Sequence, residues 1–117
     1  MTFKRNELLY LQDIYDATSK IEEFIVNMSY DEFSRDEKTQ YAIIRAFEII
    51  GEASNKISEG LKEVYFDLPW REMSGMRNKL IHEYFGINTE VIWKTTKEDI
   101  PLLKKQIKTI IDQQNIS

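Results

Sequence analysis

Apolar residues recur at helical spacing along every long segment of this chain, and no segment alternates as a half-buried strand does. Residues 5–28 carry one such stripe, which is typical of an amphipathic helix. Similar patterns predict helices over about 34–59, over about 70–85 and in the segments that follow residue 88. The sequence therefore predicts an all-α fold: an antiparallel bundle of four to five helices in a single domain over residues 1–117.

Short polar signals place the helix boundaries. Ser34, with Glu37 three residues later, has the form of a capping box and predicts a helix start. Gly60 stands where this helix needs a C-terminal cap, and residues 61–69 then form a linker that ends in proline. Pro101 either kinks the last segment or lies in the first turn of a final helix capped by Asp99.

The predicted second helix has an apolar surface that covers about half of its circumference, more than a simple surface helix needs. This width predicts burial on two sides, by the bundle and by a partner subunit. A polar strip remains, in which Arg45 is spaced to pair with Glu48 and with Glu52. Gly51 lowers the stability of the helix by about 1 kcal/mol relative to alanine. A close approach of another helix would explain why a glycine stands at this position. The strip is either an exposed set of ion pairs or the source of a counter-charge for Arg77.

Composition limits the functions that this chain can have. The formal net charge is −4, whereas dedicated nucleic-acid binders usually carry a basic footprint. Zero cysteines exclude disulfides and thiolate metal sites, and one histidine excludes a multi-histidine metal site within one chain. We expect no metal or cofactor and a cytoplasmic location. A modest basic strip near the C-terminus is expected to be a solvated face; it comprises Lys94, Lys97, Lys104, Lys105 and Lys108.

The only histidine, His82, lies in the run Arg77-Asn78-Lys79-Leu80-Ile81-His82-Glu83-Tyr84. Histidine is the side chain whose unperturbed pKa lies nearest neutral pH, and arginine keeps its charge and suits a phosphate. The helical pattern places Arg77 and Tyr84 within the apolar face, where an unpaired charge is costly. Arg77 and His82 are about 140° apart on an ideal helix. They can meet only if the long arginine side chain reaches across the helix or if a second copy of the helix brings their partners together, and this geometry favours a dimer.

Arg77, His82 and Tyr84 form the pattern R-x4-H-x-Y, which resembles the signature of HepT-like proteins in the HEPN superfamily of small helical ribonucleases. The stretch 45–53 is similar to that family's second helix. The segments 91–93 and 99–101 resemble its C-terminal part. The resemblance therefore covers nearly the whole chain.

The resemblance implies a homodimer in which two signature helices face each other across a cleft. It implies a metal-independent endoribonuclease, the toxin of a toxin–antitoxin pair, with Arg77 and His82 as catalytic residues. Asn78 matches the polar residue common after the arginine, and Tyr84 matches the tyrosine to which a minimal nucleotidyltransferase antitoxin attaches AMP. Arg45, Glu48 and Glu52 are candidates for supporting roles around the site.

Metal-free RNA cleavage needs a general base, a general acid and positive charge at the phosphate. Because one chain has one histidine, a two-histidine mechanism requires His82 from two subunits, with Arg77 holding the phosphate and Asn78 and Tyr84 positioning RNA. One alternative is a non-catalytic helical subunit that binds a nucleotide or a nucleotidyltransferase partner. Another is a purely structural dimer in which Arg77 forms an interface salt bridge with Glu48 or Glu52.

Overall fold

The computed structural model describes residues 5–81 and 88–116, and their side chains over residues 6–76 and 88–114. This part of the chain contains four long α-helices and three short ones. The long helices are α1 (Arg5–Phe24), α3 (Glu37–Asn55), α5 (Trp70–Ile81) and α7 (Ile100–Ile116). The short ones are α2 (Tyr30–Ser34), α4 (Glu59–Val64) and α6 (Thr89–Lys94). Since these two ranges contain no strand, the predicted all-α fold is confirmed.

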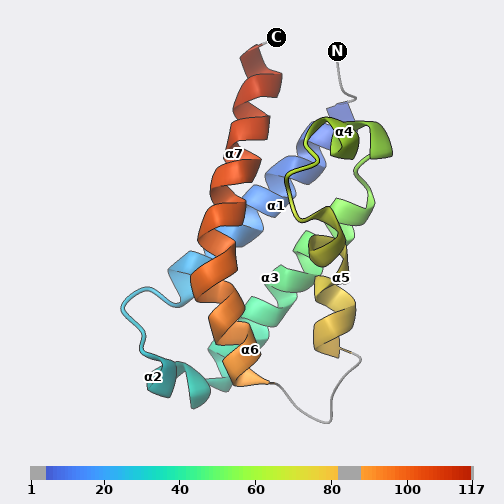
Figure 1. Cartoon of the computed structure of the whole chain (residues 1–117). Coiled ribbons are helices and arrows are strands. Elements are labelled where there is room, and N and C mark those ends of the chain that lie inside the picture. Colours follow the sequence, from blue (N-terminus) through green and yellow to red (C-terminus); the bar gives the residue numbers. More distant parts are fainter. Residues whose placement is uncertain (1–4, 82–87, 117) are drawn as a thin grey trace.

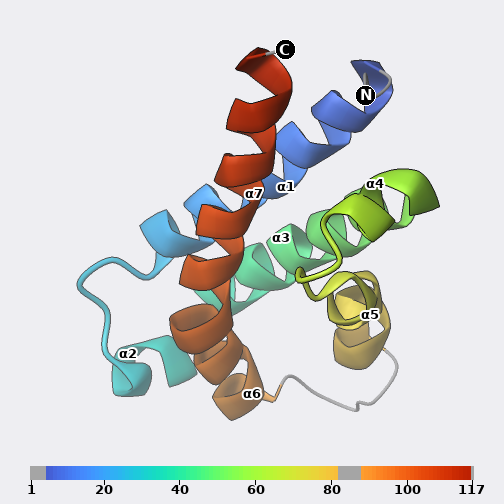
Figure 2. The ribbon, with the colours of Figure 1, turned by 45° about the horizontal axis from the view of Figure 1, so that its top comes forward.

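The long helices pack in the spatial order α7, α1, α3, α5 (Figures 1 and 2). α1 runs antiparallel to both α3 and α7, as the sequence predicts for a bundle with short connections. Fully buried side chains from these helices form one core. Its largest members are Phe33, Phe47, Leu11, Ile14, Ile21, Ile43, Ile50, Leu61, Met73, Ile92, Ile100 and Ile107.

α3 is buried on two sides, as its wide apolar surface predicts. The structure shows, however, that α1 and α5 of the same chain cover these two sides. Ile43, Phe47 and Ile50 are each no more than 1% exposed, and Gly51 is buried with them. The width of the apolar surface is therefore accounted for within one chain, without a partner subunit.

The start of α3 differs from the prediction. Asp36, and not Ser34, caps α3: its carboxylate accepts the Thr39 backbone N–H at 3.1 Å and the Thr39 hydroxyl at 2.7 Å. Ser34 ends α2, and its hydroxyl donates to the Asp31 carbonyl at 2.7 Å. The capping box that does form joins Ser29 and Glu32, at the start of α2.

The end of α3 also differs from the prediction. α3 ends at Asn55, and Gly60 lies inside α4 instead of forming a C-terminal cap. Ser58 caps α4, with its hydroxyl accepting the Leu61 N–H at 3.2 Å. The Ser58 N–H in turn donates to the buried Glu7 carboxylate at 2.7 Å, which fixes this connection against α1.

The C-terminal third is one helical run, in which a π-helical turn, η1 (Thr95–Asp99), joins α6 to α7. The Ile100 N–H donates to the Thr95 carbonyl, five residues back. Pro101 has no N–H, and its ring would clash with the carbonyl four residues earlier in a regular α-helix. Pro101 thus lies in the first turn of α7, one of the two predicted alternatives, but Asp99 lies within the helical run and does not cap it.

Candidate active site

The signature begins on α5, whose first turn is firmly anchored. The Trp70 indole N–H donates to the Tyr65 carbonyl at 2.8 Å, and the Met73 N–H donates to the Pro69 carbonyl at 2.9 Å. Trp70 and Met73 are both buried. The predicted helix start at residue 70 is confirmed, and the backbone of Arg77 and Asn78 continues this anchored helix.

α5 is tied to α3 by a hydrogen bond between Ser54 and Ser74, whose hydroxyl oxygens are 3.1 Å apart. Ser54 is fully buried and also donates to the Gly51 carbonyl at 3.3 Å. Arg77 follows Ser74 by three residues, about one helical turn. The packing of α5 against α3 therefore fixes the backbone on which the signature begins. This serine pair was not predicted from the sequence, where its only signal is two small polar residues on otherwise apolar helix faces.

His82 and Tyr84 lie outside the described residues, as do the side chains of Arg77 and Asn78. The proposed meeting of Arg77 with His82 stays a prediction. The chain resumes at Asn88, whose side chain caps α6 by accepting the Val91 N–H at 3.1 Å. Thr89 is hydrogen-bonded to the Tyr30 hydroxyl at 3.0 Å. The signature thus begins on the anchored helix α5 and ends, in sequence, before the anchored helix α6.

Arg45 lies between the two acidic residues that the sequence analysis paired with it. Its guanidinium is 3.7 Å from the carboxylates of both Glu48 and Glu52, which confirms the predicted pairing. The Arg45 side chain is 61% exposed, whereas that of Glu48 is only 24% exposed. Such solvated pairs contribute little to stability. The role of these acids as the counter-charge of Arg77 stays a prediction.

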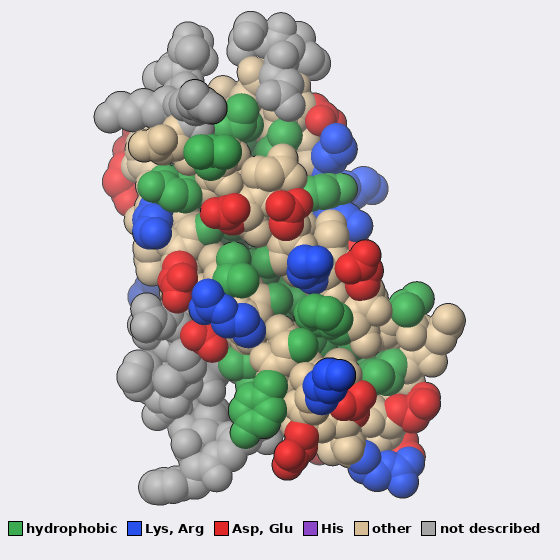
Figure 3. Space-filling model, turned by 180° about the vertical axis from the view of Figure 1, so that it is seen from behind, with side chains coloured by type: hydrophobic (Ala, Val, Ile, Leu, Met, Phe, Trp, Pro, Cys, Tyr) green, Lys and Arg blue, Asp and Glu red, His purple; other side chains and the backbone are tan. Residues whose placement is uncertain are grey.

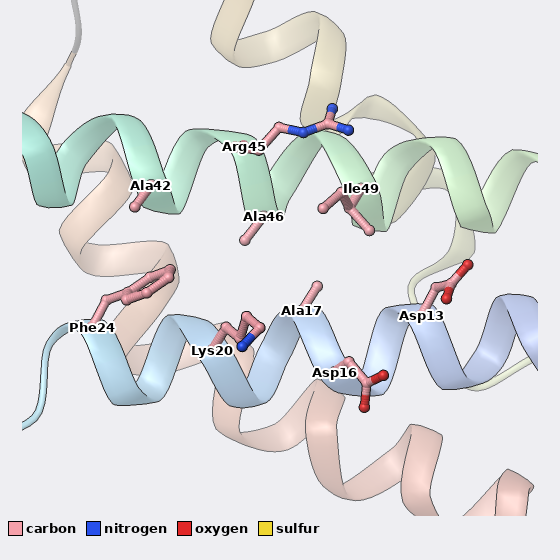
Figure 4. A pocket seen from close by; sticks show the side chains of 9 residues that line it. All are labelled: Asp13, Asp16, Ala17, Lys20, Phe24, Ala42, Arg45, Ala46 and Ile49. Carbon is pink, nitrogen blue, oxygen red and sulfur yellow. The ribbon is translucent and has the colours of Figure 1, made fainter.

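Arg45 also borders a groove of about 380 Å³ between α1 and α3 (Figure 4). Three alanines, Ala17, Ala42 and Ala46, leave space between the two helices, and Phe24 and Ile49 add apolar surface. Two aspartates, Asp13 and Asp16, and two cations, Lys20 and Arg45, line its polar edge. Among the lining residues with described side chains, the charges balance and there is no nucleophile or histidine. This groove offers no chemistry for RNA cleavage.

Among the described side chains, no group of three or more carboxylates or histidines is positioned to hold a metal ion. None of the helices in the described ranges combines the length and the apolarity that crossing a bilayer requires.

Comparison with known proteins identifies the family. The model of the family described as ribonuclease HepT-like matches residues 14–110. This chain belongs to the HepT-like ribonuclease family. A probable ribonuclease HepT of Thermococcus cleftensis is 50% identical over 107 residues, which is 92% of this chain and 97% of that protein.

Other HepT-like relatives are similar over the same length. A candidate RNase of Methanocaldococcus jannaschii is 43% identical over 92% of this chain and 98% of its own length. One of Caldanaerobacter subterraneus is 39% identical over 90% of this chain and 94% of its own length. No solved structure matches the chain. The family predicted from R-x4-H-x-Y and the neighbouring segments is confirmed.

Proposed function

We propose that this chain is a metal-independent endoribonuclease in which Arg77 and His82 are catalytic. The observation that carries the proposal is the complete R-x4-H-x-Y signature in a chain that is 50% identical to a probable ribonuclease HepT. The anchored α5 backbone supports it, because catalytic residues need a rigid element to hold them. Asn78 and Tyr84 position the RNA in this proposal, and Arg45, Glu48 and Glu52 support the site from α3.

The proposed reaction uses the ribose 2′-hydroxyl as nucleophile. One imidazole removes its proton, and the 2′-oxygen forms a bond to phosphorus while the bond to the 5′-oxygen breaks. A second imidazole, in its protonated form, gives a proton to the leaving 5′-oxygen. The products are a 2′,3′-cyclic phosphate and a 5′-hydroxyl. General acid–base assistance contributes about 10²–10⁴-fold, and the Arg77 guanidinium stabilises the charge that develops on phosphorus oxygens.

Two imidazoles require two copies of this chain, because each copy has one histidine. We therefore propose a homodimer of single-domain chains, with both His82 side chains and Arg77 from one or both copies in a shared cleft. α1 and α5 already cover the two sides of α3. The case for the dimer therefore rests on the histidine count and on the family resemblance.

We further propose that the protein is a cytoplasmic toxin, silenced by a nucleotidyltransferase antitoxin that attaches AMP to Tyr84. The added group is bulky and anionic, so it would exclude RNA from the cleft both sterically and by charge. A second candidate is a non-catalytic subunit that binds a nucleotide or a nucleotidyltransferase. The net charge of −4 favours this candidate, because it opposes the approach of RNA. Nucleotide binding without RNA turnover would distinguish it from the enzyme.

Induced expression in a bacterial host, wild type beside His82→Ala, tests the toxin proposal. Growth arrest and RNA loss with the wild type alone are the expected result. Intact-mass measurement of both proteins must show that Tyr84 is unmodified. Harmless expression of both folded and unmodified proteins would instead favour the binding subunit.

A further inference from the structure

A second groove, of about 280 Å³, lies where α7 crosses α1. Its lining residues are Tyr15 and Glu22 of α1 and Pro101, Lys104, Lys105 and Lys108 of α7. We call it the lysine groove. It contains three of the five lysines that the sequence analysis assigned to a solvated face. The structure thus gathers these three cations around a concave surface.

The charge of the lysine groove is opposite to that of the whole chain. Three lysines and the Glu22 carboxylate line the groove, and Asp112, outside the lining, pairs with Lys108. Three positive charges against two negative ones leave an excess of one positive charge, whereas the formal net charge of the chain is −4. The described residues that line the α1–α3 groove have balanced charges. A third groove, between α5 and α7, is bordered by Asp67, Glu72 and Asp99, and none of its lining residues with a described side chain is a cation. Figure 3 shows basic side chains gathered along one edge of the back face, while acidic and basic side chains are interspersed over the rest.

Each cation of the lysine groove is held differently. Lys104 lies 2.8 Å from Glu22, with its ammonium 5.7 Å from the centre of the Tyr15 ring. Lys108 lies 2.9 Å from Asp112, the next carboxylate along α7. These hydrogen bonds raise the pKa of both lysines, so both stay charged at neutral pH. Lys105 is exposed, and within the described part of the chain no carboxylate is paired with it.

We propose that the lysine groove binds the phosphate backbone of single-stranded RNA at a distance from the cleaved bond; this rests on the proposed ribonuclease function. Ammonium groups on flexible stems suit a backbone of variable geometry, and a basic groove with an aromatic ring is a usual surface for single strands. The groove lies on the helical run that begins at Thr89, next in sequence to the signature. The same run carries a further cation outside the lining of the groove, Lys97, whose ammonium lies 5.5 Å from the centre of the Trp93 ring.

Salt dependence of RNA binding tests this proposal. The probe is a fluorescein-labelled oligouridylate of about 16 nucleotides, bound by the full-length His82→Ala protein so that it is not cut. A groove variant carries Lys104→Gln, Lys105→Gln and Lys108→Gln. A control variant carries Lys38→Gln, Lys56→Gln and Lys62→Gln, on α3, α4 and their connection, and has the same net charge. Circular dichroism must show that both are folded.

We plot the logarithm of the RNA association constant against the logarithm of the salt concentration. In the groove variant the magnitude of this slope should fall by up to about 2, because each lost phosphate contact on a single strand removes about 0.7. The control should keep the slope of the parent protein. Glu22→Gln should act in the opposite direction and tighten binding by about threefold, because it frees Lys104 from its carboxylate partner. Equal slopes for groove and control variants would overturn the proposal.

Vesicles containing phosphatidylserine form a second arm of the test. If wild type bound these vesicles through the same lysines and did not bind the RNA, the groove would be a lipid surface and the proposal would be wrong. A wild-type protein that cleaves no RNA would count against the proposed function, while the salt slopes would still decide what the lysine groove binds.

Discussion

At the scale of single residues, two buried threonine hydroxyl groups differ in their hydrogen bonding. Thr18 and Thr96 are each at most 1% exposed. The Thr18 hydroxyl donates to the Tyr15 carbonyl at 2.7 Å. The Thr96 hydroxyl lies in the π-helical turn and has no hydrogen-bond partner within the described residues. Burying an unpaired hydroxyl costs free energy that a methyl group of the same shape would not.

We predict opposite effects for the same substitution at these two sites. Thr96→Val should raise the free energy of unfolding by about 1 kcal/mol, because it removes an unsatisfied polar group. Thr18→Val should lower it by about 1 kcal/mol, because it removes a formed hydrogen bond. Urea denaturation followed by circular dichroism measures both. A loss of stability in Thr96→Val would show that its hydroxyl has a partner after all.

At the scale of elements, side-chain caps decide where the helices begin. Thr39 donates two hydrogen bonds to the Asp36 carboxylate, one from its hydroxyl and one from its backbone N–H. Both lower the pKa of Asp36 below its usual 3.8, and the hydroxyl has the larger effect. Hydrogen bonds from Ser29, through the backbone and the side chain, likewise lower the pKa of Glu32 below 4.5. A carboxyl group whose pKa is lowered by folding stabilises the folded state above its unfolded pKa, and this contribution disappears as pH falls through the folded pKa.

We therefore predict that Asp36→Asn makes the melting temperature less sensitive to acid below about pH 4. Asparagine still caps a helix well, so stability near neutral pH should change little. Asp13→Asn, at an exposed position inside α1 that caps no helix, is the matched control. Thermal melts between neutral pH and about pH 2 measure the effect. Identical acid dependence in wild type and Asp36→Asn would refute the role of this cap.

The caps also show how far sequence reasoning reaches. The pattern of a serine followed three residues later by glutamate occurs at Ser19, Ser29 and Ser34. Ser19 lies inside α1, and only Ser29 forms a capping box. Asp36, between Ser34 and Glu37, is the residue that caps α3. The periodicity of apolar residues alone could not decide between Ser34 and Asp36 as the cap. Pro101 predicted a kink or a helix start. The structure has a π-helical turn just before it, between the buried residues Ile92 and Ile100, and this turn has no signal in the periodicity.

At the scale of the whole molecule, one chain forms a helical bundle with its own buried core but contains one histidine. The sequence predicted the helical fold, the start of α5, the Arg45 ion pairs and the family. It did not predict the Ser54–Ser74 link or the lysine groove. Both arise where helices distant in sequence meet, which periodicity within one helix cannot reveal.

A shared cleft predicts that one defective copy disables the proposed dimer. Mixed dimers of wild type and His82→Ala, isolated through two different affinity tags, should lose at least about 10²-fold in cleavage rate, because acid and base come from different copies. Mixed dimers of wild type and Glu72→Ala, an exposed position on α5, should keep the full rate. If the mixed dimers of wild type and His82→Ala kept about half of the wild-type rate, each copy would act alone and the shared cleft would be wrong.

The most direct test of the proposed ribonuclease is cleavage of a labelled RNA by purified wild type, Arg77→Ala and His82→Ala in the presence of EDTA. We predict cleavage by the wild type and a loss of at least about 10²-fold in each variant, because each removes a group that acts in the transition state. Glu72→Ala, prepared in parallel, should match the wild type, which shows that a substitution on α5 does not by itself abolish cleavage. The loss in Arg77→Ala and His82→Ala, purified in the same way, then excludes a contaminating nuclease. Equal cleavage by all four proteins, or none by the unmodified wild type, would contradict the proposed function.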